Sequence, residues 1–390
     1  MSQINSNRTF VEIRDETAWG DEGAGGNAEL VPVLDGEYSV GLEDPVREQQ
    51  HVVGDQDAFY ATQDRRNLGG SFKTGCWPHL SKRLLDWAVV RTSGETGSIA
   101  VRDDLPGIEA RVHAGLKVDS LTIEGSTEGD IMFNFDCRGR HEETESNLTY
   151  PGSYTIPDIP SLTFKNTRYV ISLNASGDDS FTNRISPVGL SSFSLSFRNN
   201  LKEGPPVEDR TDLEKDGRPE YLTAGRRNME VRFTATFDRQ AYMTLQRQRL
   251  YAQFKMLGAH PAWTNTAVVD AAGASAGTSV AVPVTADVTS NFSVNDYVLF
   301  DNAGGSNLPC VGKITAITAT DMTIDTLDEN VVSGDNIFNA AIEIRTAPIL
   351  VSTTTLQRNF DDTLLVEVSG QIFSGGAEPL TYKATDMTLP

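Results

Sequence analysis

The chain has 390 residues, of which 54 are acidic and 33 basic, giving a formal net charge of −21. Nucleic acid repels such a protein at long range, which excludes DNA binding by charge attraction. No apolar run approaches the ~20 residues of a membrane span. Because the cysteines number only three and the N-terminus is polar, without a signal-peptide layout, we expect a protein made and kept in a cytoplasm.

Composition divides the chain into four parts. Residues 1–45 are polar and glycine-rich and are expected to form an N-terminal arm. Residues 46–262 are expected to form the first part of a strand-rich β domain. Residues 345–390 are expected to supply the final strands of the same domain and a C-terminal arm. Between them, residues 263–344 shift to Ala, Thr, Val, Asp and Gly with short strands and turns, which indicates an inserted small β domain.

Within residues 1–70, short apolar clusters predict an arm, one strand or hairpin, and a long loop. A helix is predicted next, in "GCWPHLSKRLLDWAVV" at 75–90, beginning near Pro78. Its apolar positions share one face and would cover a sheet; they are Leu80, Leu84, Leu85 and Ala88.

Strict alternation of apolar and polar residues then predicts long strands with one buried and one solvent-exposed face. "LKVDSLTIEG" and "IMFNFDCRG" are predicted to form a hairpin around the turn "EGD", with Ile131, Phe133, Phe135 and Cys137 on the apolar face. Asp130, Met132, Asn134 and Asp136 take the opposite face. Further strands are predicted at 167–174, 190–199 and 228–238, with a long charged loop between the last two and a short helix at "RQAYMTLQRQ" before the strand "RLYAQFKML".

The residues reveal no catalytic motif. Cys76-X-X-His79 and Cys137-X3-His141 have metal-like spacings, but no second cysteine pair completes either. "DLEKDG" at 212–217 begins like a calcium loop, yet Thr223 stands where the bidentate Glu belongs. Phosphate-loop and nucleophile-elbow patterns are also missing. We therefore expect no enzyme, no metal and no cofactor.

Four stretches in order carry a resemblance: "LGGSFKTGCWPHLSKRLLDWAV", the hairpin "LKVDSLTIEG…GDIMFNFDCRG", "FSLSFRNNLKEG" and "GRRNMEVRFTATFD". Together they resemble the major tail tube protein of long-tailed, siphovirus-like bacteriophages over residues 40–257 and 345–390. The resemblance implies a mainly β fold, a β-sandwich or half-barrel with flanking short helices. It also implies rings of six copies that stack into a tube, through whose lumen DNA leaves the virion.

Site residues follow from this resemblance. The candidates for lining the lumen are Glu124, Asp130, Asn134, Asp136 and Glu230, and the alternative is that these are charges on the outer surface. An acidic lumen would repel phosphates. The candidates for contacts between rings are Phe59, Tyr60 and Tyr221, although Tyr221 packing on its own domain is the alternative. Segments 1–45, 41–70 and 200–228 and the C-terminal tail are expected to lack structure until assembly orders them.

Partners also follow from the resemblance. They are further copies of the chain, tape measure protein and phage DNA in the lumen, and tail terminator and distal tail proteins, with no membrane. The protein would assemble in the host cytoplasm and reside in the virion tail, with the 263–344 insertion on the outer surface. Two other classes stay open, namely another virion component (decoration, terminator or distal tail) and a carbohydrate-binding β module with an aromatic-lined cleft.

Overall fold

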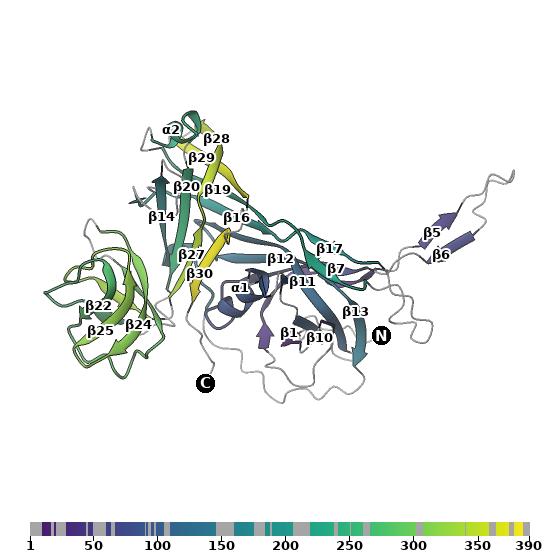
Figure 1. Cartoon of the computed structure of the whole chain (residues 1–390), viewed down its shortest axis with the longest axis horizontal. Coiled ribbons are helices and arrows are strands. Elements are labelled where there is room, and N and C mark those ends of the chain that lie inside the picture. Colours follow the sequence, from purple (N-terminus) through teal and green to yellow (C-terminus); the bar gives the residue numbers. More distant parts are fainter. Residues whose placement is uncertain are drawn as a thin grey trace.

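The computed structural model is mainly β, with two α-helices among the residues it describes (Figure 1). Those residues are 10–16, 19–20, 29–43, 46–49, 60–63, 67–89, 91–92, 95–96, 99–104, 110–145, 160–174, 184–187, 189–205, 219–237, 241–249, 251–259, 266–301, 307–339, 341–358, 364–373 and 378–384.

Six antiparallel strands form what we call the first layer. In spatial order they are β7 (Asn67–Gly75), β12 (Met132–Gly139), β11 (Ala110–Ser126), β16 (Ser192–Arg198), β19 (Asn228–Thr236) and β29 (Leu364–Phe373). Apolar and polar residues alternate along these strands, so one face of the layer is buried and the other is exposed to solvent. The predicted hairpin and its apolar face, Ile131 through Cys137, are confirmed because all four of these side chains are buried.

A second layer packs against the apolar face of the first, which gives a sandwich. The second layer comprises β14 (Thr167–Asn174), β20 (Tyr251–Gly258), β27 (Ile342–Thr346) and β30 (Leu380–Ala384), and β28 (Ile349–Arg358) joins the layers by pairing with both β29 and β20. Aromatic rings fill the space between the layers; Phe193 lies 5.3 Å from Phe254 and 5.4 Å from Tyr169, centroid to centroid. The mainly β, sandwich-like fold is thus confirmed.

Helix α1 (Ser81–Val89) lies over the apolar face of the first layer. Trp87 stacks on Phe72 and Phe135, with centroids at 6.1 and 5.6 Å, and its indole N–H donates to the Leu116 carbonyl at 3.1 Å. The helix begins three residues after Pro78. The second predicted helix is also present, as α2 (Ala241–Arg247).

Strand β11 belongs to two sheets because it bends at Gly115. Its second half pairs with β12 and β16, whereas its first half pairs with β10 (Ile99–Asp104) and β13 (His141–Glu145). Gly115 has φ +71°, and a Cβ there would lie 2.7 Å from Arg140 Cβ and 2.8 Å from Trp19 Nε1. The bend therefore requires glycine.

The described parts of the segments expected to lack structure contain strands, so that prediction was wrong for them, and residues 1–70 hold more than the one strand or hairpin predicted there. β1 (Phe10–Asp15) pairs with β10 and β2 (Glu29–Val31), while β3 (Val33–Tyr38) and β4 (Gly41–Glu43) pair with β7. Val11 and Ile13 are buried in the main core. Short strands of this kind are stabilised by distant partners rather than by their own composition.

Two ribbons occupy the other such segments. β5 (Val46–Gln49) pairs with β6 (Tyr60–Gln63), and Figure 1 shows this ribbon projecting far from the sandwich. β17 (Leu201–Glu203) pairs with β18 (Leu222–Ala224), and Leu201 and Leu222 are buried. A third, two-residue pair joins β8 (Arg91–Thr92) to β9 (Glu95–Thr96). Within the described residues no helix is both long and apolar enough to cross a membrane.

A separate six-stranded sheet is built from chain inserted between β20 and β27. Its strands in spatial order are β21 (Thr266–Val268), β26 (Asn336–Phe338), β23 (Tyr297–Asp301), β24 (Cys310–Ile317), β25 (Asp321–Leu327) and β22 (Gly277–Pro283). It encloses its own core, which includes Val282, Phe300 and Ile324. Figure 1 shows it beside the second layer, away from the first.

The six-stranded sheet is seated on the outer side of β14 and β20. Val170 and Leu257, which point away from the main core, share a small cluster with Leu299 and Val311. Consequently seven of the eight residues of β20 are buried, on both faces. This includes Lys255, a residue that alternation alone would place in solvent.

Candidate functional site: the polar face of the first layer

The polar face of the first layer is the surface on which most predicted lumen residues meet. We define it by the outward residues of the six strands: Ser71, Lys73, Asn134, Asp136, Arg138, Ser120, Thr122, Glu124, Ser126, Ser192, Ser194, Ser196, Arg198, Glu230, Arg232, Thr234, Glu367, Ser369 and Gln371.

Strand register brings these residues into rows across the sheet. One row runs Lys73–Asn134–Thr122–Ser196–Glu230–Gln371, and the next runs through Met132, Glu124, Ser194, Arg232 and Ser369. Neighbours in a row are directly opposite each other, so their side chains are within contact range. Residues that are far apart in sequence thus form one continuous surface.

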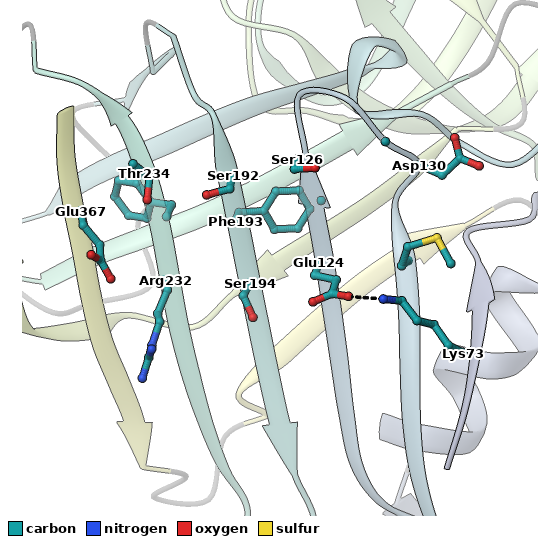
Figure 2. A pocket seen from close by; sticks show the side chains of 14 residues that line it. Lys73, Glu124, Ser126, Asp130, Ser192, Phe193, Ser194, Arg232, Thr234 and Glu367 are labelled. Carbon is teal, nitrogen blue, oxygen red and sulfur yellow. Dashed lines mark hydrogen bonds and ion pairs between the residues drawn. The ribbon is translucent and has the colours of Figure 1, made fainter. Parts of the chain in front are cut away.

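Hydroxyl groups dominate the middle of the polar face. Ser192, Ser194 and Ser196 alternate with Phe193, Leu195 and Phe197, which are buried. A hollow of about 830 Å³ lies over these strands, and Figure 2 shows Ser194, Arg232 and other lining side chains on neighbouring strands. Hydroxyls hold water by donating and accepting hydrogen bonds without adding charge.

Charges on the polar face are mostly paired with one another. Lys73 Nζ lies 2.6 Å from Glu124 Oε1 on the strand two places away, and Figure 2 marks this contact. Arg232 binds Glu230 on its own strand at 2.5 Å. Arg138 lies 3.1 Å from Glu203, a residue of the β17–β18 ribbon. Such half-exposed pairs add little stability, but each cancels the field of its members.

The charge of this face is close to balanced. Among its described side chains, four are basic and six acidic, counting Asp130 and Asp119 at its margins: Lys73, Arg138, Arg198 and Arg232 against Asp119, Glu124, Asp130, Asp136, Glu230 and Glu367. Residues 266–339, by comparison, hold nine acidic residues and one basic. Much of the acidic excess of the chain is therefore outside this face.

Asp136 is the acidic residue whose ionisation the surroundings oppose. Burial, followed by repulsion from Asp119, raises the pKa of Asp136, although Arg138 and the Cys137 N–H act the other way. A raised pKa disfavours the charged form in the folded state. The polar face therefore loses negative charge at Asp136 at a higher pH than an isolated aspartate would.

Each predicted lumen residue has a definite place. Asn134 and Asp136 are exposed on β12, and Glu124 and Glu230 are half-buried on β11 and β19. Asp130 precedes β12 at the margin of the hollow, where its carboxylate accepts a hydrogen bond from Ser161 at 2.5 Å. The structure thus brings all five to one side of one layer.

The predicted ring contacts are more scattered. Phe59 lies outside the described residues, and Tyr60 is the first residue of β6. Tyr221 is 46% exposed, next to the β17–β18 ribbon, where its carbonyl accepts a hydrogen bond from Gly204 at 2.8 Å. Tyr60 and Tyr221 therefore belong to two different ribbons.

The sequence-based prediction did not include several residues of the polar face. Lys73 and Arg232 were not selected, nor were the serines of β16, although their alternation was the available signal. The calcium-like stretch 212–217 lies outside the described residues. Within the described part of the chain, no group of three His, Cys, Asp or Glu side chains could hold a metal ion. Burial raises the pKa of the Cys76 thiol to about 12, which disfavours the thiolate that a metal would need.

Comparison with known proteins identifies the family. The family model described as phage tail tube protein matches residues 6–256, which is more than half of the chain and includes β7, β11, β12, β16 and β19 of the first layer. No curated protein matches the sequence. Members of this family are structural proteins of the virion tail, which assemble as tubes from copies of one chain. The chain belongs to the phage tail tube protein family.

Proposed function

We propose that six copies of this chain close a ring, that rings stack into the tail tube, and that the polar face of the first layer lines the lumen. One observation carries the proposal. Six strands present a largely polar surface rich in hydroxyls, with charges that pair internally. That surface suits a channel, because DNA and the tape measure protein must slide along it without binding.

The balanced charge of the polar face would make the electrostatic interaction between the lumen wall and DNA weak. A strongly acidic lining would repel phosphates, and a basic one would release counterions and hold the genome tightly. A lining of serine and threonine hydroxyls with Lys73–Glu124 and Arg232–Glu230 pairs does neither. DNA would then move along a hydrated, nearly neutral wall, which replaces the acidic lumen expected from net charge.

Ring stacking is assigned to the two ribbons. The β5–β6 ribbon projects from the sandwich (Figure 1), and it contains Tyr60. Tyr221, beside the β17–β18 ribbon, offers an exposed aromatic ring. Projecting strands with free edges can pair with a neighbouring copy, so that strand addition becomes an assembly bond. Contacts between copies within one ring are separate from these, and they close the ring when the rotation per copy is right.

The remaining assignments rest on the family and on the architecture. We propose a siphovirus-like tail, assembled in the host cytoplasm, with terminator and distal tail proteins at the tube ends. We divide the chain as residues 1–45, 46–262, 263–344 and 345–390, and place the third part on the outer surface. Its own core and its position beside the second layer, away from the polar face, support this placement.

Single cysteines test the lumen assignment. The three native cysteines are buried, so Ser194→Cys reports the polar face and Thr278→Cys on β22 reports the six-stranded sheet. Both variants should react with a maleimide on a bulky polymer as free subunits. In assembled tubes Thr278→Cys should keep reacting and Ser194→Cys should become protected. Equal labelling of Ser194→Cys before and after assembly would exclude the polar face as the lumen wall.

A further inference from the structure

Strand β28 has an edge that no other described strand covers along most of its length. It pairs with β29 from Leu350 to Arg358, but with β20 only at Ile349 and Leu350. An open edge of this kind is a template for a strand from another chain.

The side chain of Gln246 occupies that edge. Its Nε2 donates to the Ser352 carbonyl at 3.0 Å, and its Oε1 accepts from the Thr354 N–H at 3.2 Å. A glutamine amide has the same donor and acceptor as a peptide group. Bonding to residues i and i+2 of a strand is the pattern made by one residue of a parallel neighbouring strand. Gln246 thus substitutes for a strand at this point.

Helix α2 holds Gln246 in place without help from the amide. Tyr242 and Leu245 are fully buried, and the Tyr242 ring meets Phe233 edge-on at 6.4 Å. The Thr354 hydroxyl donates to the Tyr242 carbonyl at 3.4 Å, which ties the helix to β28. Figure 1 shows α2 at one end of the sandwich, beside β28 and β29. Removing the Gln246 amide should therefore leave the helix docked.

The sequence of β28 indicates what the edge would bind. "ILVSTTTLQ", residues 349–357, has no charge, no proline and no glycine, and it is rich in β-branched residues. Segments with this composition pair with identical copies of themselves. Leu356 is also 43% exposed, two residues beyond Thr354. The partner that fits this edge is the same strand of a second copy.

We propose that Gln246 closes the β28 edge against strand addition by a second copy of this chain. The subunit would then stay free until it is placed in a growing assembly, rather than joining other subunits through β28. The device does not depend on the tube, because an open self-pairing edge is a hazard for any β protein.

The test compares the full-length chain with Gln246→Ala and with Gln248→Ala, an exposed glutamine two residues along that bonds to β28 in no described contact. Thr355→Cys is added to all three as a cross-linking site on β28. Hydrogen exchange of the Thr354 amide reports the edge, and sedimentation velocity reports association. We expect the Thr354 amide to exchange about tenfold faster in Gln246→Ala, since its own hydrogen bond to Gln246 is lost. This variant should also form oligomers that oxidise to β28–β28 disulfides, whereas Gln248→Ala behaves as the parent.

Two results would overturn the inference. One is faster exchange in Gln246→Ala with no gain in association over Gln248→Ala, because an open edge would then attract no second copy. The other is unchanged exchange, because the amide would then close nothing. Gln246→Glu provides a second variant: its carboxylate accepts from Thr354 but repels the Ser352 carbonyl, and its oligomers should fall between those of the parent and Gln246→Ala. Each readout is made on free subunits, so failure of tube assembly is a separate outcome.

Discussion

Replacing Lys255 with methionine should loosen the six-stranded sheet from the sandwich. The Lys255 side chain is only 3% exposed, and its Nζ lies 2.8 Å from Asp328 Oδ2 and 3.6 Å from Glu343 Oε2. Burial alone would raise the pKa of Asp328, but Lys255 outweighs it and the pKa is lowered. The ammonium group therefore neutralises one carboxylate on each side of the interface.

The expected loss follows from what the substitution leaves behind. Methionine keeps the apolar stem but removes the charge, so Glu343, at 4% exposed, and Asp328 both lose their shared cation. Removing one member of a buried ion pair costs about 3–5 kcal/mol. Asp328 is 28% exposed, and Lys383 stays 3.8 Å from Glu343 Oε1, so both carboxylates are partly relieved. We therefore expect a loss of about 3 kcal/mol, at the low end of that range.

Urea unfolding followed by circular dichroism measures this loss. The quantity compared with the parent is the free energy of unfolding of the transition in which the six-stranded sheet unfolds. Lys383→Met is the matched control; its side chain is about a third exposed, and we expect less than about 1 kcal/mol. The double variant Lys255→Met/Glu343→Gln should recover most of the loss, because the deeply buried carboxylate of Glu343 is then uncharged and Asp328, at 28% exposed, is left to solvent. A loss under about 1 kcal/mol for Lys255→Met, or no recovery in the double variant, would refute this reasoning.

Three further predictions concern single positions. Burial lowers the pKa of His79 from 6.5 to about 4, so the unfolded chain takes up the proton at a higher pH than the folded one. The free energy of unfolding should therefore fall as the pH is lowered from 6.5 to 4, by about 3 kcal/mol in total. His79→Gln should flatten that decline in thermal unfolding, and an unchanged pH profile would contradict it. Because the pKa of Asp136 is raised, its charge opposes folding above that pKa and has no effect once both states are protonated. Asp136→Asn should therefore raise the unfolding midpoint at pH 7 but not at pH 3, and equal effects at both would refute the sign. Gly115→Ala should cost about 2 kcal/mol or more, from the φ of +71° and the contact with Trp19, and urea unfolding identical to the parent would contradict the bend requirement.

The long strands and both helices could be predicted because their signals are local. Alternation in β12 and β16 fixes which side chains are buried, and the apolar spacing of α1 fixes its inner face. The same alternation placed Asn134 and Asp136 on a common polar face. Local periodicity therefore predicts most of the first layer and part of the candidate site.

Features that depend on distant partners could not be predicted. The bend at Gly115 is packed against Trp19, almost a hundred residues earlier, whose indole N–H donates to the Gly115 carbonyl, and β1 is a strand because β10 pairs with it. The Lys73–Glu124 pair needs the register of two strands that are not adjacent in the sheet. Burial of Lys255 likewise arises from the inserted chain, because alternation alone places it in solvent.

Electron microscopy of the purified full-length chain, concentrated and with a tail-tip initiator complex added, tests the central claim most directly. The account predicts stacked rings that form a tube with a central channel, six copies in each ring, and the six-stranded sheet as an outward projection. Subunits that stay unassembled in the presence of the initiator, or rings whose channel is walled by the six-stranded sheet, would contradict it.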